Sequence, residues 1–222
     1  MFYTTIGSRE TPAHIQMQMA YLGYSLSAEG HVIRSGGARG ADAAFQLGSM
    51  ATGLPNREIY LPNATFTMSP NGSKIPLDAD PTHVVPTETA MISAVELLRD
   101  NGIGRSRIRP GITAQDLLRR DPVVRLFARN AFQVLGYNLT TPSTELIGYM
   151  PLFGPPGGSK IAFDLAAAYG IPTFNLARAT DLNRFMRTPS SPAAVAVRRY
   201  LEALPFHPAA LLDDDYTPPS SL

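Results

Sequence analysis

Three glycine-rich stretches, each placed directly after a run of apolar residues, are the part of this sequence best suited to chemistry. Backbone N–H groups in such turns lie open to an anion, because glycine has no Cβ to block its approach. A basic side chain accompanies each turn: Arg9, then Arg39, then Lys160. We therefore predict that the turns together bind a phosphate-bearing ligand, with the alternative that glycine serves only the geometry of the turns. The residues predicted to contact the ligand are Gly7, Ser8, Arg9, Ser35, Gly36, Gly37, Arg39, Gly40, Asp42, Gly154, Gly157, Gly158, Ser159 and Lys160.

Few other side chains in the sequence suggest catalysis. Glu10 follows the first turn, where its carboxylate could reach a ribose hydroxyl, act as an acid–base group, or simply pair with an arginine. The four histidines are scattered and lack metal-ligand spacing, so we predict no metal site, and we predict no cofactor. The patterns G-x-x-x-x-G-K-[ST] and G-x-G-x-x-G are missing, which argues against a P-loop ATPase and an ordinary dinucleotide dehydrogenase.

Alternating strands and helices must hold these turns in place. Short β-branched or apolar runs predict strands, and apolar residues at spacings of three and four predict the helices between them. Strand, helix and strand in this order are typical of parallel βαβ units, so we predict an α/β fold, a three-layer Rossmann-like parallel sheet with an elaborated middle insert. The predicted strands are 2–6, 31–34, 58–61, 146–150 and 171–176. The predicted helices include 12–28, 41–50, 88–101, 160–169, 180–187 and 192–203, with Thr11 as the N-cap of the first, Pro12 at its first position and a long loop over 62–86.

Composition limits the classes of function. Hydrophobic residues make up 44% of the chain and charged residues 17%, which suits a packed core and excludes broad disorder. The net charge of +1 gives no whole-molecule argument for nucleic-acid binding. Cysteine is absent, which excludes disulfides and cysteine nucleophiles. No apolar run approaches the roughly 20 residues of a membrane span, and the first residues lack the pattern of a signal peptide. We therefore expect a cytoplasmic protein with no membrane partner.

Positive charge is concentrated in one segment. Between Arg99 and Arg129 the chain has eight arginines and three acidic residues, a local charge of +5. Binding to a phosphate backbone needs such clustered charge, so this segment is the strongest sign of a nucleic-acid partner, with a solvated helix surface as the alternative. Stacking on bases would also need exposed aromatic rings, and Phe127 and Phe132 look like core residues.

The string Ser35–Asp42, S-G-G-A-R-G-A-D, resembles the S-G-x-A-x-G-x-D element of the SMF/DprA–Lonely Guy superfamily, called SLOG. Gly7-Ser8-Arg9 fits the same family, and the third turn is similar to its second glycine motif. Small DprA-like members, many of them encoded by phages, are similar over residues 2–62. The resemblance covers residues 2–62 and 146–176 and does not account for the rest. We predict one domain over 1–188, with its core at 1–62 and 146–176 and an Arg-rich insert at 87–135, followed by a C-terminal helix and Pro-rich acidic tail over 189–222.

The DprA branch of the superfamily implies binding of single-stranded DNA. Under this resemblance Arg39 would hold a phosphate. Asp42 matches the motif aspartate, which could bind ligand or instead cap or brace the turn. The resemblance is also the only basis for expecting a homodimer.

The Lonely Guy branch implies a different activity, release of the base from a nucleoside 5′-monophosphate, through the motif P-G-G-x-G-T-x-x-E. Pro156-Gly157-Gly158 match this motif, but Lys160 replaces Gly, Ile161 replaces Thr and Asp164 replaces the catalytic Glu. Glu10 and Asp164 are then the candidate catalytic residues, although an ion pair with Lys160 one helical turn earlier explains Asp164 equally simply.

Three functions therefore follow as hypotheses. The first is binding of a nucleotide, a nucleotide-derived ligand or the phosphate of a single-stranded nucleic acid at the glycine turns. The second is an N-glycosidase, a phosphoribohydrolase acting on a nucleoside monophosphate. The third is a structural or interaction protein that uses the fold as a scaffold.

Overall fold

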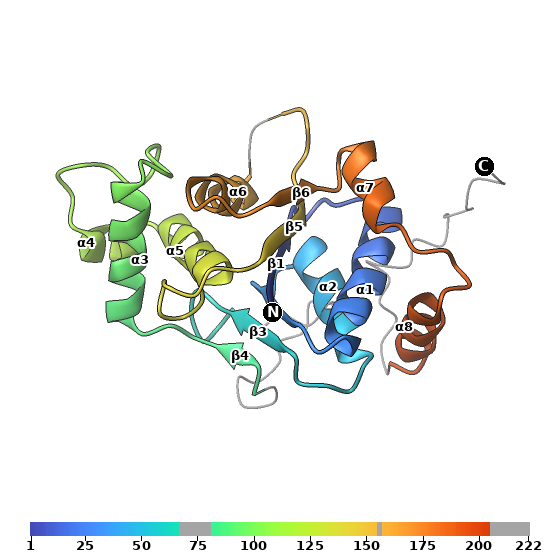
Figure 1. Cartoon of the computed structure of the whole chain (residues 1–222). Coiled ribbons are helices and arrows are strands. Elements are labelled where there is room, and N and C mark those ends of the chain that lie inside the picture. Colours follow the sequence, from blue (N-terminus) through green and yellow to red (C-terminus); the bar gives the residue numbers. More distant parts are fainter. Residues whose placement is uncertain (67–80, 155–156, 205–222) are drawn as a thin grey trace.

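The fold is built on one sheet of six parallel strands. The computed structural model describes residues 1–66, 81–154 and 157–204. The strand order is β4-β3-β2-β1-β5-β6, with β1 at the centre (Figure 1). This arrangement confirms the predicted Rossmann-like α/β fold. The strands are β1 (Phe2–Gly7), β2 (Val32–Ser35), β3 (Arg57–Tyr60), β4 (His83–Val84), β5 (Glu145–Tyr149) and β6 (Thr173–Asn175).

Helices cover both faces of the sheet and make the outer two layers (Figure 1). One face packs against α1, α2 and α8, and the other packs against α3, α5 and α6. The helices are α1 (Ala13–Ala28), α2 (Ala41–Met50), α3 (Glu88–Asp100), α4 (Ala114–Arg120), α5 (Pro122–Leu135), α6 (Ser159–Ala168), α7 (Ala179–Phe185) and α8 (Pro192–Glu202).

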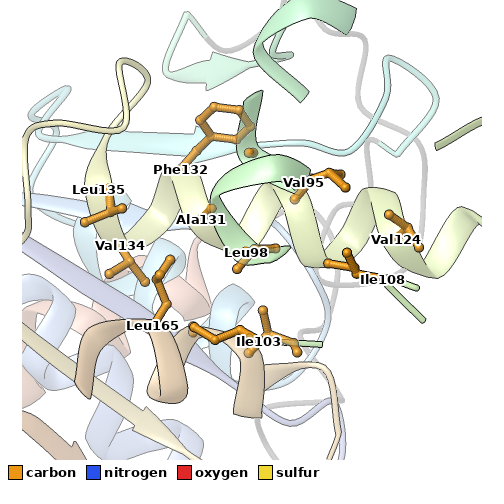
Figure 2. Packing of buried hydrophobic residues seen from close by; sticks show 14 of the residues in the cluster. Val95, Leu98, Ile103, Ile108, Val124, Ala131, Phe132, Val134, Leu135 and Leu165 are labelled. Carbon is orange, nitrogen blue, oxygen red and sulfur yellow. The ribbon is translucent and has the colours of Figure 1, made fainter. Parts of the chain in front are cut away.

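Two hydrophobic clusters, one on each side of the sheet, form the core. Neighbouring residues of β5 show the division: Leu146 packs in the cluster of α3, α5 and α6, and Ile147 packs in the cluster of α1, α2 and α8. Successive side chains of a strand point to opposite faces, which explains this alternation. Figure 2 shows the first cluster, in which Phe132 and Val134 of α5 lie with Leu98 of α3 and Leu165 of α6.

Helices α1 and α2 touch through their backbones. A Cβ atom added at Gly48 would lie 1.8 Å from the carbonyl oxygen of Ala20, and one at Gly23 would lie 2.4 Å from the carbonyl oxygen of Phe45. Both glycines are inside helices, where glycine is normally unfavourable. The close approach of the two helices therefore explains why glycine occupies these positions.

The structure differs from the sequence predictions at several points. Strand β4 was not predicted, because only two residues form it at the end of the Pro-rich segment 62–86. Thr11 does not cap α1: its hydroxyl donates to the carbonyl of Ser8 at 2.7 Å, Pro12 is the N-cap, and no side chain caps the helix. The domain boundary at 188 stays a prediction, and α8 beyond it packs in the cluster with α1. The predicted tail from 205 and residues 67–80 of the loop lie outside the described residues.

No helix in the described part of the chain is long and apolar enough to cross a membrane.

Candidate functional site

Parallel strands end at the same edge of a sheet, so the turns after β1, β2 and β5 lie together. The amide of Ser8 donates to the carbonyl of Tyr149 at 2.9 Å, which joins the first turn to the end of β5. The amide of Ala41 in turn donates to the carbonyl of Ser8 at 3.3 Å. We call this place the junction, and define it as residues 7–10, 35–42 and 157–160 together with Arg129 and Asn130 of α5.

Asp42 braces the first and second turns. Its Oδ1 accepts a hydrogen bond from the amide of Gly7 at 3.2 Å, and its Oδ2 accepts one from the amide of Ala38 at 3.4 Å. The same Oδ2 pairs with Nη1 of Arg129 at 3.4 Å. Asp42 is only 1% exposed, so its carboxylate serves these internal contacts. These contacts brace the turn, and a role of Asp42 in binding ligand stays a prediction.

Arg129 brings a buried positive charge to the junction from α5. The residue is 5% exposed, and its Nε has no hydrogen-bond partner among the described residues. Burial lowers the pKa of Arg129, and the charge of nearby Arg9 lowers it further, while Asp42 opposes both effects. Burial likewise raises the pKa of Asp42, against the effect of Arg129 and of its backbone donors. The pair therefore holds a guanidinium that is incompletely hydrogen-bonded, close to a second arginine.

Asn130, the next residue of α5, reaches the third turn. Its Nδ2 donates to the carbonyl of Gly158 at 2.8 Å, and its Oδ1 has no partner among the residues that the structure describes. Arg129 binds the second turn and Asn130 binds the third. Helix α5 of the insert therefore links two glycine turns that are far apart in the sequence.

The glycines of the junction are of two kinds. In the first two turns the space of a missing Cβ is filled by the protein itself. A Cβ at Gly36 would lie 1.1 Å from Nη1 of Arg129, one at Gly7 would lie 2.6 Å from Cβ of Ala41, and one at Gly40 would lie 2.5 Å from the carbonyl oxygen of Ser8. Gly37 and Gly40 also have positive φ angles of 64° and 78°. These glycines are explained by packing and backbone conformation.

The glycines of the third turn lie beside space that no described residue fills. No described atom comes within 4 Å of a Cβ added at Gly158 or Gly154, and only Oγ of Ser159, at 4.0 Å, is near one added at Gly157. Gly154 has a positive φ of 93°, but Gly158 has a φ of −58°, which any residue adopts. Neither contact with the described residues nor backbone conformation therefore explains glycine at position 158, whereas close approach of a ligand would explain it.

The remaining predicted residues surround the junction. Arg9 and Arg39 are exposed, and neither has an ion-pair partner in the described part of the chain. Glu10 is exposed, and its amide donates to Oγ of Ser8 at 3.1 Å. Ser35 and Ser159 are buried, and Oγ of Ser35 has no partner among the described residues.

Lys160 and Asp164 form the ion pair that helical spacing allows. Nζ of Lys160 lies 2.5 Å from Oδ1 of Asp164 and 2.7 Å from its Oδ2. The carboxylate proposed for catalysis therefore has a lysine bound to both of its oxygens.

Most arginines of the insert are paired with acidic residues. Arg125 places Nη2 within 3.0 Å of both carboxylate oxygens of Glu88, and Arg99 binds Glu96. Arg107 binds Asp121, and both Arg119 and Arg120 lie near Asp116. Arg105 and Arg109 have no acidic partner among the described residues.

Sequence reasoning missed Arg129 and Asn130 as site residues. Arg129 was counted with the surface arginines of the insert, because nothing in its spacing separates it from them. Among residues 1–66, 81–154 and 157–204, no three histidine, aspartate or glutamate side chains are grouped to hold a metal ion.

Of the known protein families, curated proteins and solved structures compared with the chain, only the solved structures gave a match. No family model matches the chain, and no curated protein matches it. A solved structure of DNA processing protein A from Helicobacter pylori, described for its single-stranded DNA binding mode, is similar to it, with a TM-score of 0.46 and 16% identity. The similarity covers 91% of this chain and 80% of that chain.

Proposed function

We propose that the junction binds the phosphate group of a nucleotide or of a single-stranded nucleic acid. The observation that carries the proposal is the buried guanidinium of Arg129, whose Nε has no partner among the described residues, set between two glycine turns by the same helix that binds the third turn. Arg9 and Arg39 add exposed charge at the rim. The junction therefore has four cations, counting Lys160, against the two carboxylates of Asp42 and Glu10. Lys160 is already paired with Asp164.

The start of α6, which no side chain caps, favours an anion at the same edge. At the start of α2 the amides of Ala41 and Ala43 already donate to the carbonyls of Ser8 and Ala38.

The motif resemblance supports the same proposal from the sequence. Membership of the SLOG superfamily, a homodimer and a cytoplasmic location stay predictions made from the sequence. The phosphate chemistry is common to a free nucleotide and to a DNA strand, so an experiment must separate the two.

The nucleoside hydrolase receives less support. Asp164 is bound by Lys160 through both oxygens, which opposes its use as a free acid or base. Glu10 is exposed and remains the candidate acid–base group for that reaction. Release of free base from a nucleoside monophosphate, lost in Glu10→Gln, would establish the hydrolase.

Arg9→Gln and Arg39→Gln are expected to weaken phosphate binding by about 1.5–3 kcal/mol each, the usual loss for a hydrogen bond to a charged group. This loss corresponds to a factor of roughly 10–150 in affinity. Calorimetric titration with the common nucleoside 5′-monophosphates and with oligothymidine measures it and shows which of the two is bound. Arg199→Gln, an exposed arginine on α8, is the matched control for charge. Unchanged affinity in both junction variants would contradict the proposal.

Gly158→Ala is expected to leave the stability within about 0.5 kcal/mol of the parent, because its Cβ would meet no described atom and its φ suits alanine. The same substitution is expected to weaken phosphate binding, since the Cβ would occupy the space in front of α6. Thermal unfolding gives the first quantity, and titration with the phosphate ligand gives the second. If binding is also unchanged, the third turn does not contact the phosphate, and the ligand is held at the first two turns alone.

A further inference from the structure

A shallow hollow on the surface of the insert is lined by three arginines, and none of its lining residues belongs to the junction. It lies between the segment that follows α3 and the α4–α5 corner. Its lining residues are Ser106, Arg107, Arg109, Ile112, Leu117, Arg120 and Asp121. We call this surface the arginine hollow. It is the feature of the insert that the proposed function leaves unexplained.

The segment that carries the arginines is fixed to the core. Ile103 and Ile108 are buried in the cluster of α3, α5 and α6. Figure 2 shows Ile103 near Leu98 and Leu165, and Ile108 near Val124. The amides of Arg107 and Ile108 both donate to the carbonyl of Gly104, at 2.9 and 2.8 Å. The buried isoleucines therefore fix the positions of the exposed arginines Arg105, Arg107 and Arg109. A ligand would bind a surface that is already formed.

The acidic residues of this surface are already engaged. Oδ1 of Asp121 accepts from the amide of Val123 at 2.9 Å, and its Oδ2 binds Nη1 of Arg107 at 3.0 Å. Asp116, the other acidic residue nearby, accepts from Thr113 and is shared by Arg119 and Arg120.

These contacts leave an excess of positive charge. Residues 101–121 contain five arginines and two aspartates, a local charge of +3. Arg109 has no ion-pair partner in the described ranges, and Arg120 lies 3.6 Å from Asp116 and has a side chain 67% exposed. The hollow therefore presents guanidinium groups with donors to spare, next to the aliphatic side chains of Ile112 and Leu117.

We propose that the arginine hollow is a second phosphate-binding surface, which takes the backbone of a single-stranded nucleic acid. All the cations of the segment are arginines, and a guanidinium can both bind a phosphate through two hydrogen bonds and stack on an unpaired base. A peptide bearing carboxylates would use the paired hydrogen bonds of a guanidinium but not its ability to stack on a base. The proposal does not depend on the junction, because the two surfaces share no residue.

Binding of fluorescein-labelled oligothymidine, measured by anisotropy over a range of salt concentrations, tests the proposal. The double variant Arg109→Gln/Arg120→Gln is expected to bind at least about tenfold more weakly. The slope of log affinity against log salt is expected to fall by about 0.7 for each phosphate that an arginine no longer neutralises. Arg109→Lys/Arg120→Lys is expected to keep most of the salt slope, because it keeps the charge. Arg119→Gln, on the same helix as Arg120 but outside the hollow, is the matched control and is expected to retain affinity.

Three results would overturn the proposal. They are an equal loss in Arg119→Gln, no loss in the double variant, and displacement of oligothymidine by polyglutamate as readily as by unlabelled strand. The same measurements in an Arg9→Gln/Arg39→Gln background separate the two surfaces. If the double variant of the hollow still weakens binding of oligothymidine in that background, the loss is due to the hollow. If only the junction variants weaken binding, the proposed function is supported and the proposal for the hollow is wrong.

Discussion

Asp42→Ala is expected to lower the free energy of unfolding by about 3–5 kcal/mol, the usual effect of removing one partner of a buried ion pair. The substitution leaves the guanidinium of Arg129 buried without its carboxylate. It also removes the acceptor for the amides of Gly7 and Ala38, which adds the cost of unsatisfied buried donors. Denaturation by urea, with the slope checked for a change in the unfolded state, measures the effect.

The double variant Asp42→Ala/Arg129→Met is the control for this result. It removes both charges, so it is expected to be more stable than Asp42→Ala alone, and the cycle of four proteins gives the coupling energy of the pair. A loss below about 1 kcal/mol in Asp42→Ala would fall in the range of an exposed ion pair. The pair would then not brace the turns, and the structural basis of the junction would be wrong.

Gly48→Ala is expected to destabilise the protein by an amount near the upper end of the about 1–3 kcal/mol that overpacking costs. In an isolated helix the same change stabilises by about 1 kcal/mol, so the structure predicts the opposite sign. The reason is the 1.8 Å separation between the added Cβ and the carbonyl oxygen of Ala20, which is backbone and cannot rotate away. The two helices would have to move apart and loosen the cluster around Phe45.

Thermal and urea unfolding of Gly48→Ala beside Gly158→Ala gives a matched comparison. Both substitutions add one methyl group, but only the first would overlap another part of the chain. If the two variants are equally stable, the α1–α2 contact is looser than its geometry indicates.

The strands and helices of the sheet were largely predictable, because parallel βαβ units place short apolar runs at regular positions. Strand β2 and helix α2 lie where the sequence indicates, on either side of the motif Ser35–Asp42. Strand β4 was not predictable, because its two residues carry no alternating pattern of their own. It forms a strand only by pairing with β3. Thr11 has the right residue type for an N-cap, yet its hydroxyl binds the carbonyl of Ser8 instead. The hydroxyl of Thr11 could bind either the first amides of α1 or the carbonyl of Ser8, and residue spacing alone does not distinguish the two.

The site was predictable only in its outline. The first and second turns meet, as parallel topology requires, and α5 contacts both the second and the third turn. The sequence does not say what fills the space beside each glycine. Gly36 and Gly158 look alike in sequence, and the first makes room for Arg129 while the second lies beside open space. The parts of the junction that come from α5 depend on tertiary packing between distant segments, for which no local pattern exists.

Helix α5 has a consequence for how the junction would recognise a ligand. Phe132 and Val134 hold it in the core, and Arg129 and Asn130 hold two of the turns. Asp42 and Gly158, the parts of the turns that α5 holds, therefore cannot move toward a ligand unless α5 shifts with them. At the positions that α5 holds, the shape of the site is therefore set before a ligand arrives.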